Sequence, residues 1–147
     1  MELGLSLSGG GIKGAAHIGA LAAIEEEKIK INYISGTSSG SIVASLYSMG
    51  YSPEEIYSIF KKYCKKIKYV KIANILKLIY GLIIKREIII SGLNNGKEIE
   101  LLLKKYSRKK GIINIEDINL PLVIPSVNLQ DGSVCIFSSI KKRRILF

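Results

Sequence analysis

Near its start the chain reads Leu-Gly-Leu-Ser-Leu-Ser-Gly-Gly-Gly-Ile-Lys-Gly, which are residues 3–14. A short apolar run that stops at consecutive glycines is typical of a buried strand followed by a tight turn. Small residues recur through residues 12–27, which we expect to form a helix that can approach a sheet closely. The chain is therefore predicted to begin with a strand, a glycine loop and a helix.

A second unit repeats this order. Residues 31–35 predict another short strand, and a helix is expected after the sequence GTSSG at residues 36–40. This G-x-S-x-G pattern between a strand and a helix is typical of a nucleophile elbow, which projects its serine from the edge of the sheet. Ser38 is then the candidate nucleophile, while Gly36 and Gly40 leave room for the sharp turn. Taken alone, the motif also fits a packing turn or a phosphate site.

The first glycine loop has two functional interpretations beside that of a simple tight turn. It matches G-x-G-x-x-G, a dinucleotide-binding pattern, but the acids at residues 25–27 fall within the predicted helix and not at the end of a second strand. Alternatively, adjacent glycine N–H groups point into one spot and form an oxyanion hole, since glycine tolerates unusual φ values and close approach. Lys13 would orient this loop or add positive charge. The adjacent glycines are Gly9, Gly10 and Gly11.

The rest of the chain predicts further helices and then a hairpin. The expected helices span residues 39–49, run from Pro53 to about residue 66, and run from a cap at Asn94 or Asn95 to Tyr106. Residues 67–92 fit either a helix or an extended segment. Strands are expected at residues 122–127 and 134–137, joined by a turn at residues 130–132. Two strand–turn–helix units followed by a hairpin predict an α/β fold with a partly parallel sheet.

Composition excludes several classes of protein. The 147 residues fit one domain, and a hydrophobic content of 48% excludes intrinsic disorder. Two cysteines, Cys64 and Cys135, are too few for a disulfide scaffold or a four-ligand zinc site, so a reducing compartment is expected. Charged residues interrupt the apolar stretch 72–90, and no signal peptide is visible. We therefore expect a cytoplasmic protein, soluble or peripheral to a membrane.

The net charge of +10 favours attraction to anionic surfaces. Lysines interleave with aromatic residues after residue 60, which fits either a solvated helix face or a face resting on anionic lipid. No base-reading motif accompanies the basic residues, so binding to nucleic acid is not expected.

Together, the glycine loop and the serine elbow resemble the patatin-like phospholipase family. The resemblance is carried by residues 5–14, 16–21 and 34–42, and more weakly by residues 120–124 and 132–137. It implies a three-layer α/β fold and hydrolysis of lipid acyl esters by a serine–aspartate dyad, without a cofactor or a metal. Ser38 would be the nucleophile and Gly9 to Gly11 with Gly14 the oxyanion loop. The dyad needs no histidine, so the resemblance implies a structural role for His17.

The chain departs from the family pattern at the dyad acid. The family places this aspartate in a later D-G-G or D-G-A motif, whereas Asp131-Gly132-Ser133 lies in the predicted hairpin turn and Asp117 precedes a predicted strand. We therefore expect residues 1–147 to be a partial patatin-like domain, incomplete at its C-terminus and with impaired turnover. The alternatives are a non-catalytic remnant or lipid-surface binding module and, below it, a nucleotide-binding module.

Overall fold

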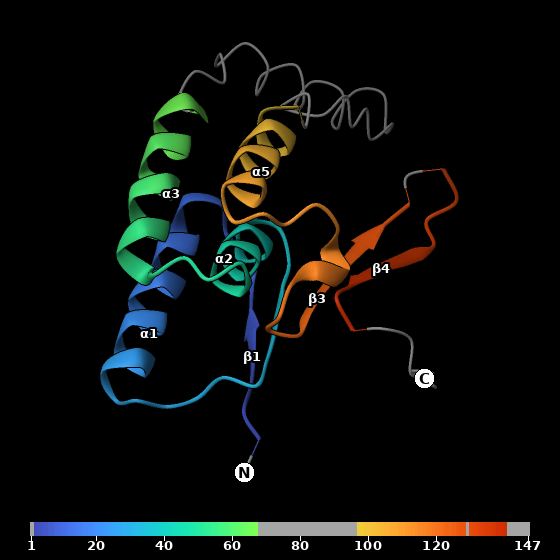
Figure 1. The fold of residues 1–147 in the computed structure, drawn as a ribbon. Helices are drawn as coiled ribbons and strands as arrows, with labels where there is room; N and C mark the ends of the chain where they lie inside the picture. The colour runs from blue at the N-terminus through green and yellow to red at the C-terminus, as the bar shows by residue number, and fades with distance from the viewer. Residues whose placement is uncertain (1, 68–96, 129, 141–147) are drawn as a thin grey trace.

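The computed structural model describes residues 2–67, 97–128 and 130–140, which form an α/β fold around one four-stranded sheet (Figure 1). The strands are β1 (Gly4–Leu7), β2 (Tyr33–Gly36), β3 (Leu122–Val127) and β4 (Val134–Ser138), and they lie in this order across the sheet. The pairs β1–β2 and β2–β3 are parallel, whereas β3 and β4 form an antiparallel hairpin. The expected α/β class and partly parallel sheet are confirmed.

The register of β1 and β2 sets the position of both motifs. Leu7 is paired with Gly36, so the two strands end at the same edge of the sheet. The glycine loop leaves β1 there, and the serine motif leaves β2 beside it. Parallel pairing thus brings together two segments that are about thirty positions apart in the sequence.

The helices cover the sheet and enclose the core. They are the 3₁₀ turn η1 (Gly11–Gly14), α1 (Ala15–Glu26), α2 (Ser39–Ser48), α3 (Pro53–Ile67), α5 (Lys97–Lys109) and the 3₁₀ turn η3 (Ile115–Asp117). Helix α2 packs on the sheet and is itself nearly enclosed by its neighbours (Figure 1). The largest fully buried side chains come from α1, α2, α3, β2 and β3, and they are Leu21, Ile34, Val43, Leu46, Ile56 and Leu122.

Most of the predicted elements are confirmed, with one correction. The helix expected over residues 12–27 is divided, because η1 turns through Gly11–Gly14 before α1 begins at Ala15. The predicted start of α3 is confirmed: Ser52 accepts a hydrogen bond from the Glu55 N–H, and the Glu55 carboxylate accepts one from the Ser52 N–H. The predictions for residues 67–92 and for a cap at Asn94 or Asn95 lie almost wholly outside the described residues.

Close approach between α2 and the end of β1 generates a testable pair of substitutions. A Cβ atom at Gly40 would collide with the carbonyl oxygen of Leu7, whereas one at Gly19 in α1 would meet open space. We expect Gly40→Ala to lower the free energy of unfolding by about 2–3 kcal/mol. Gly19→Ala should raise it by about 0.5–1 kcal/mol, because alanine loses less backbone entropy in a helix.

Urea unfolding followed by circular dichroism compares the two variants with the parent chain. An unchanged midpoint for Gly40→Ala would contradict the close approach.

Candidate active site

Ser38 lies at the sharp turn between β2 and α2. It is the N-cap residue of α2 and has φ 49° and ψ −124°, a conformation that residues other than glycine rarely adopt. Its side chain is exposed at the carboxyl edge of the parallel strands. A serine held in a strained backbone conformation at this edge has the local geometry of a nucleophile elbow.

The glycines on each side of Ser38 are required by close packing. A Cβ atom at Gly36 would collide with the carbonyl oxygen of Gly40, and one at Gly40 would collide with Leu7. The Thr37 N–H donates to the Leu7 carbonyl at 3.0 Å, which holds the turn against the end of β1. Both positions assigned to the elbow therefore have no room for a side chain.

The glycine loop after β1 lies directly against Ser38. A Cβ atom at Gly9 would come within 3.0 Å of the Ser38 Cβ, and one at Gly14 within 2.7 Å of the Ser39 Oγ. Gly11 has φ 57°, which favours glycine, and the Lys13 N–H donates to the Gly10 carbonyl at 3.1 Å. Lys13 thus takes part in closing the loop through its backbone.

Two helix starts meet at Ser38. Helix α2 begins at Ser39, and η1 begins at Gly11 in the loop packed against it. The first amides of a helix have no acceptor within that helix, and the α2 dipole adds partial positive charge at its N-terminus. Such amides favour negative charge, so this region can stabilise an oxyanion.

His17 supports the loop from α1. Its Nε2 donates to the Ser8 carbonyl at 2.9 Å, immediately before the three glycines. It is not among the residues that line the cavity beside Ser38. This contact agrees with the structural role expected for the histidine.

An apolar cavity of about 340 Å³ opens beside Ser38. Its wall comes from the two motifs, from α3 and from α5, and consists of Gly11, Ile12, Ser38, Ser39, Ser41, Ile42, Phe60, Tyr63, Cys64 and Ile99. Burial raises the pKa of the Cys64 thiol above its ordinary value, which keeps it protonated near neutral pH. The Ser39 Oγ is buried without a hydrogen-bond partner within the described part of the chain. This wall suits a hydrocarbon chain.

The residues contributed by α3 and α5 were not predicted as part of the site. Phe60, Tyr63 and Cys64 follow an apolar pattern at helical spacing, which predicts a buried helix face. That pattern does not say which neighbour the face meets. Only the packing of α3 beside α2 brings these residues to Ser38.

Neither aspartate lines this cavity. The Asp131 carboxylate, in the hairpin turn, accepts hydrogen bonds from the N–H and hydroxyl of Ser133, and these bonds lower its pKa. The Asp117 carboxylate accepts from the N–H groups of Ile113 and Asn114 at 3.1 and 2.8 Å. Among the described residues, the cavity wall contains no carboxylate and no imidazole.

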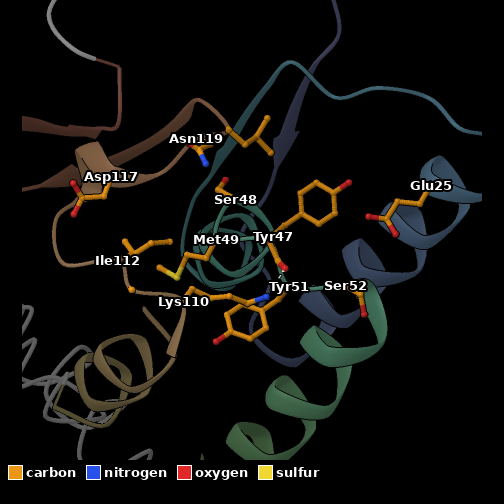
Figure 2. A pocket seen from close by; sticks show the side chains of 13 residues that line it. Glu25, Tyr47, Ser48, Met49, Tyr51, Ser52, Lys110, Ile112, Asp117 and Asn119 are labelled. Atoms are coloured by element: carbon orange, nitrogen blue, oxygen red, sulfur yellow. Dashed lines mark hydrogen bonds between the residues drawn. The ribbon is translucent and has the colours of Figure 1, made fainter. Parts of the chain in front are cut away.

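A larger cavity of about 660 Å³ lies at the opposite end of α2 (Figure 2). There the Tyr47 hydroxyl points toward Glu25, and burial together with a hydrogen bond to this carboxylate raises the pKa of Tyr47 to about 12. Lys110 donates to the Gly50 carbonyl at 2.8 Å and lies over the Tyr51 ring. This cavity shares no lining residue with the one at Ser38, so it is separate from the serine motif.

The described residues show no cluster of three or more histidine, cysteine, aspartate or glutamate side chains suited to a metal ion. Within the same part of the chain, no helix is long and apolar enough to cross a membrane. Cys64 and Cys135 are both free thiols.

Comparisons with known proteins identify what this chain resembles. A family model described as patatin-like phospholipase matches residues 5–138. Lysophospholipase NTE1 of Meyerozyma guilliermondii is 43% identical over 65 residues, which are 44% of this chain and 4% of that protein. Lysophospholipase NTE1 of Lodderomyces elongisporus is 29% identical over 137 residues, which are 93% of this chain and 9% of that protein. The chain thus spans less than a tenth of the length of these relatives.

A solved structure shows the same fold. ExoU, in the heterodimeric ExoU–SpcU complex from the type III secretion system of Pseudomonas aeruginosa, matches with a TM-score of 0.57 and 22% sequence identity. The match covers 94% of this chain and 33% of that one.

The backbone conformation of Ser38 predicts an unusual order of stabilities. Because glycine adopts positive φ at no steric cost, Ser38→Gly should have a free energy of unfolding about 1 kcal/mol higher than Ser38→Ala. At Ser41, inside α2, the order should reverse by about 1 kcal/mol, because glycine is the poorer helix former.

Urea unfolding of the four variants checks both differences. The same order at both positions would contradict a strained conformation at Ser38.

Proposed function

Because this chain belongs to the patatin-like phospholipase family, we propose that it serves in the hydrolysis of lipid acyl esters, with Ser38 as the nucleophile. One observation carries the proposal: Ser38 occupies a strained turn between a glycine loop and an apolar cavity. The cavity would hold the acyl chain while its ester carbonyl lies at the serine. The names of the lysophospholipase relatives support a lipid substrate.

The reaction would proceed through an acyl-enzyme. The Ser38 Oγ attacks the ester carbonyl carbon, its proton passes to a base, and the carbonyl electron pair moves to oxygen. Collapse of this tetrahedral intermediate expels the alcohol, which takes up a proton. Water then attacks the acyl-serine, releases the fatty acid and regenerates the hydroxyl. Each half of the reaction passes through one negatively charged oxygen.

The glycine loop would stabilise this oxygen. We assign the role to amides of Gly10 and Gly11 at the start of η1 and of Ser39 at the start of α2. Gly11 and Ser39 line the same cavity as Ser38, and Gly10 follows Gly9, which packs against Ser38. Gly9 and Gly14 would contribute by allowing close packing, because a side chain at either would displace Ser38 or Ser39. Loss of one such donor typically costs about 10²–10³ in rate.

The base would come from polypeptide other than the described residues. The family resemblance implies an aspartate, but both aspartates of this chain accept hydrogen bonds in turns elsewhere. Without a base, a serine hydroxyl is a weak nucleophile, and loss of such a partner costs roughly 10⁴ in rate. We propose that residues 1–147 alone turn over slowly.

A second candidate is a lipid-surface binding module without turnover. The lack of a carboxylate or imidazole in the described cavity wall favours it. It predicts vesicle binding that survives Ser38→Ala and weakens with salt, with no acyl-enzyme under any condition. Nucleotide binding receives less support, because the acids at residues 25–27 lie in α1 or at its C-terminal end and not at the end of β2, where a dinucleotide site needs its acid.

The assignment of Ser38 as the nucleophile is tested by labelling with an alkyl fluorophosphonate. We expect one adduct, mapped to Ser38 by peptide mass spectrometry and abolished in Ser38→Ala. Ser58→Ala is the matched control, since Ser58 is an exposed serine of α3 that does not line the cavity. Labelling of the parent chain no faster than that of Ser38→Ala would contradict a nucleophilic role.

The pH dependence of labelling reports whether a base is present. With no internal base, the rate constant should rise about tenfold per pH unit between pH 6 and 9, because only hydroxide then removes the proton. If the rate constant instead levels off above a pH of about 7 or lower, a titrating group of the protein already removes the Ser38 proton. That result would contradict the proposal that residues 1–147 alone turn over slowly.

A further inference from the structure

A groove of about 330 Å³ runs between α3 and α5, outside the cavity at Ser38. These helices lie next to each other in Figure 1. Most of its lining is apolar or aromatic, and one lysine comes from each helix: the residues are Ile59, Lys62, Tyr63, Leu101, Leu102, Lys105 and Tyr106. The groove therefore combines a hydrocarbon surface with two cations on opposite sides.

The two lysines have no carboxylate partner in the described structure. The salt bridge found there joins Lys104 to Glu100, and no acidic residue lines the groove. Lys105 lies 5.8 Å from the centre of the Tyr106 ring, and Lys109 adds a second cation at 5.5 Å from the same ring. Arg108, exposed in the last turn of α5, adds to this positive charge. The electrostatic environment favours an anion at this groove.

The groove adjoins the candidate active site. Tyr63 lines both the groove and the cavity at Ser38. Helix α3 also supplies Phe60 to the cavity and Ile59 to the groove, on successive positions. One amphiphilic molecule that passes over the Tyr63 side chain could therefore occupy the groove and the cavity at Ser38 together.

We infer that this groove binds the anionic headgroup region of a phosphate-bearing amphiphile. Lys62 and Lys105 would contact the phosphate, and Ile59, Leu101 and Leu102 would contact the adjoining hydrocarbon. Ammonium groups bind phosphate as point charges, so the groove should favour lipids with net negative charge over zwitterionic ones. The apolar lining distinguishes such a ligand from free phosphate, which would gain nothing from it. The link to catalysis rests on the proposed function, whereas the binding itself does not.

The test measures binding to the full chain carrying Ser38→Ala, so hydrolysis plays no part. The probes, studied by calorimetry below their critical micelle concentration, are dihexanoyl phosphatidylglycerol, dihexanoyl phosphatidylcholine and inorganic phosphate. We expect the phosphatidylglycerol to bind at least about fivefold more tightly than either of the others, because one exposed charge pair contributes up to about 1 kcal/mol.

Two double variants with the same change in charge locate the site. Lys62→Glu/Lys105→Glu should weaken binding of the phosphatidylglycerol about tenfold or more. Lys61→Glu/Lys104→Glu is the control on the same two helices, since neither residue lines the groove. It should weaken binding by less than about threefold, through the general field alone. Circular dichroism and thermal unfolding establish that both variants are folded.

Three results would overturn the inference: equal losses in the two double variants, equal binding of phosphatidylglycerol and phosphatidylcholine, or equal binding of inorganic phosphate. Failure of the hydrolase proposal would appear differently, as selective lipid binding without fluorophosphonate labelling of Ser38.

Discussion

The close approach of α2 to the end of β1 is the constraint on which the candidate site depends. Gly40 lies against the Leu7 carbonyl and Gly36 lies against Gly40, so backbone meets backbone there with no side chain between, and Gly14 lies against the Ser39 side chain. The glycine loop lies against Ser38 beside this contact, and Ser38 has a positive φ there. A conformation that costs about 1–3 kcal/mol persists because the surrounding packing leaves no alternative.

The same packing concentrates backbone amides where negative charge would form. The starts of η1 and α2 lie together at one edge of the sheet, in a part of the molecule whose neighbouring cavity is largely apolar. Electrostatic interactions are stronger in such surroundings than in bulk water. In the proposed reaction, these amides would stabilise the oxyanion and the cavity would hold the acyl chain. The described residues that line the cavity include no carboxylate or imidazole that could remove the serine proton.

Charge on the outer helices is related to this site through α3. One face of that helix contributes Phe60 and Cys64 to the cavity, while Lys62 lies at the neighbouring groove with Lys105 of α5. The excess of lysine in the composition carries little information by itself, since it is spread along the chain. Lys62 and Lys105 differ from the others because they lie beside an apolar groove, where their charges could contact an anion while the groove holds hydrocarbon.

The sequence by itself determined the strands, the glycine loop, the serine elbow and the family, because glycine spacing and short apolar runs are local signals. It also showed that the chain has two aspartates and placed one in a hairpin turn. The tertiary structure decided that α3 and α5 complete the cavity and that Lys62 faces Lys105 across a groove. Helical periodicity identifies a buried face but not its partner, since that choice depends on contacts between residues distant in the chain.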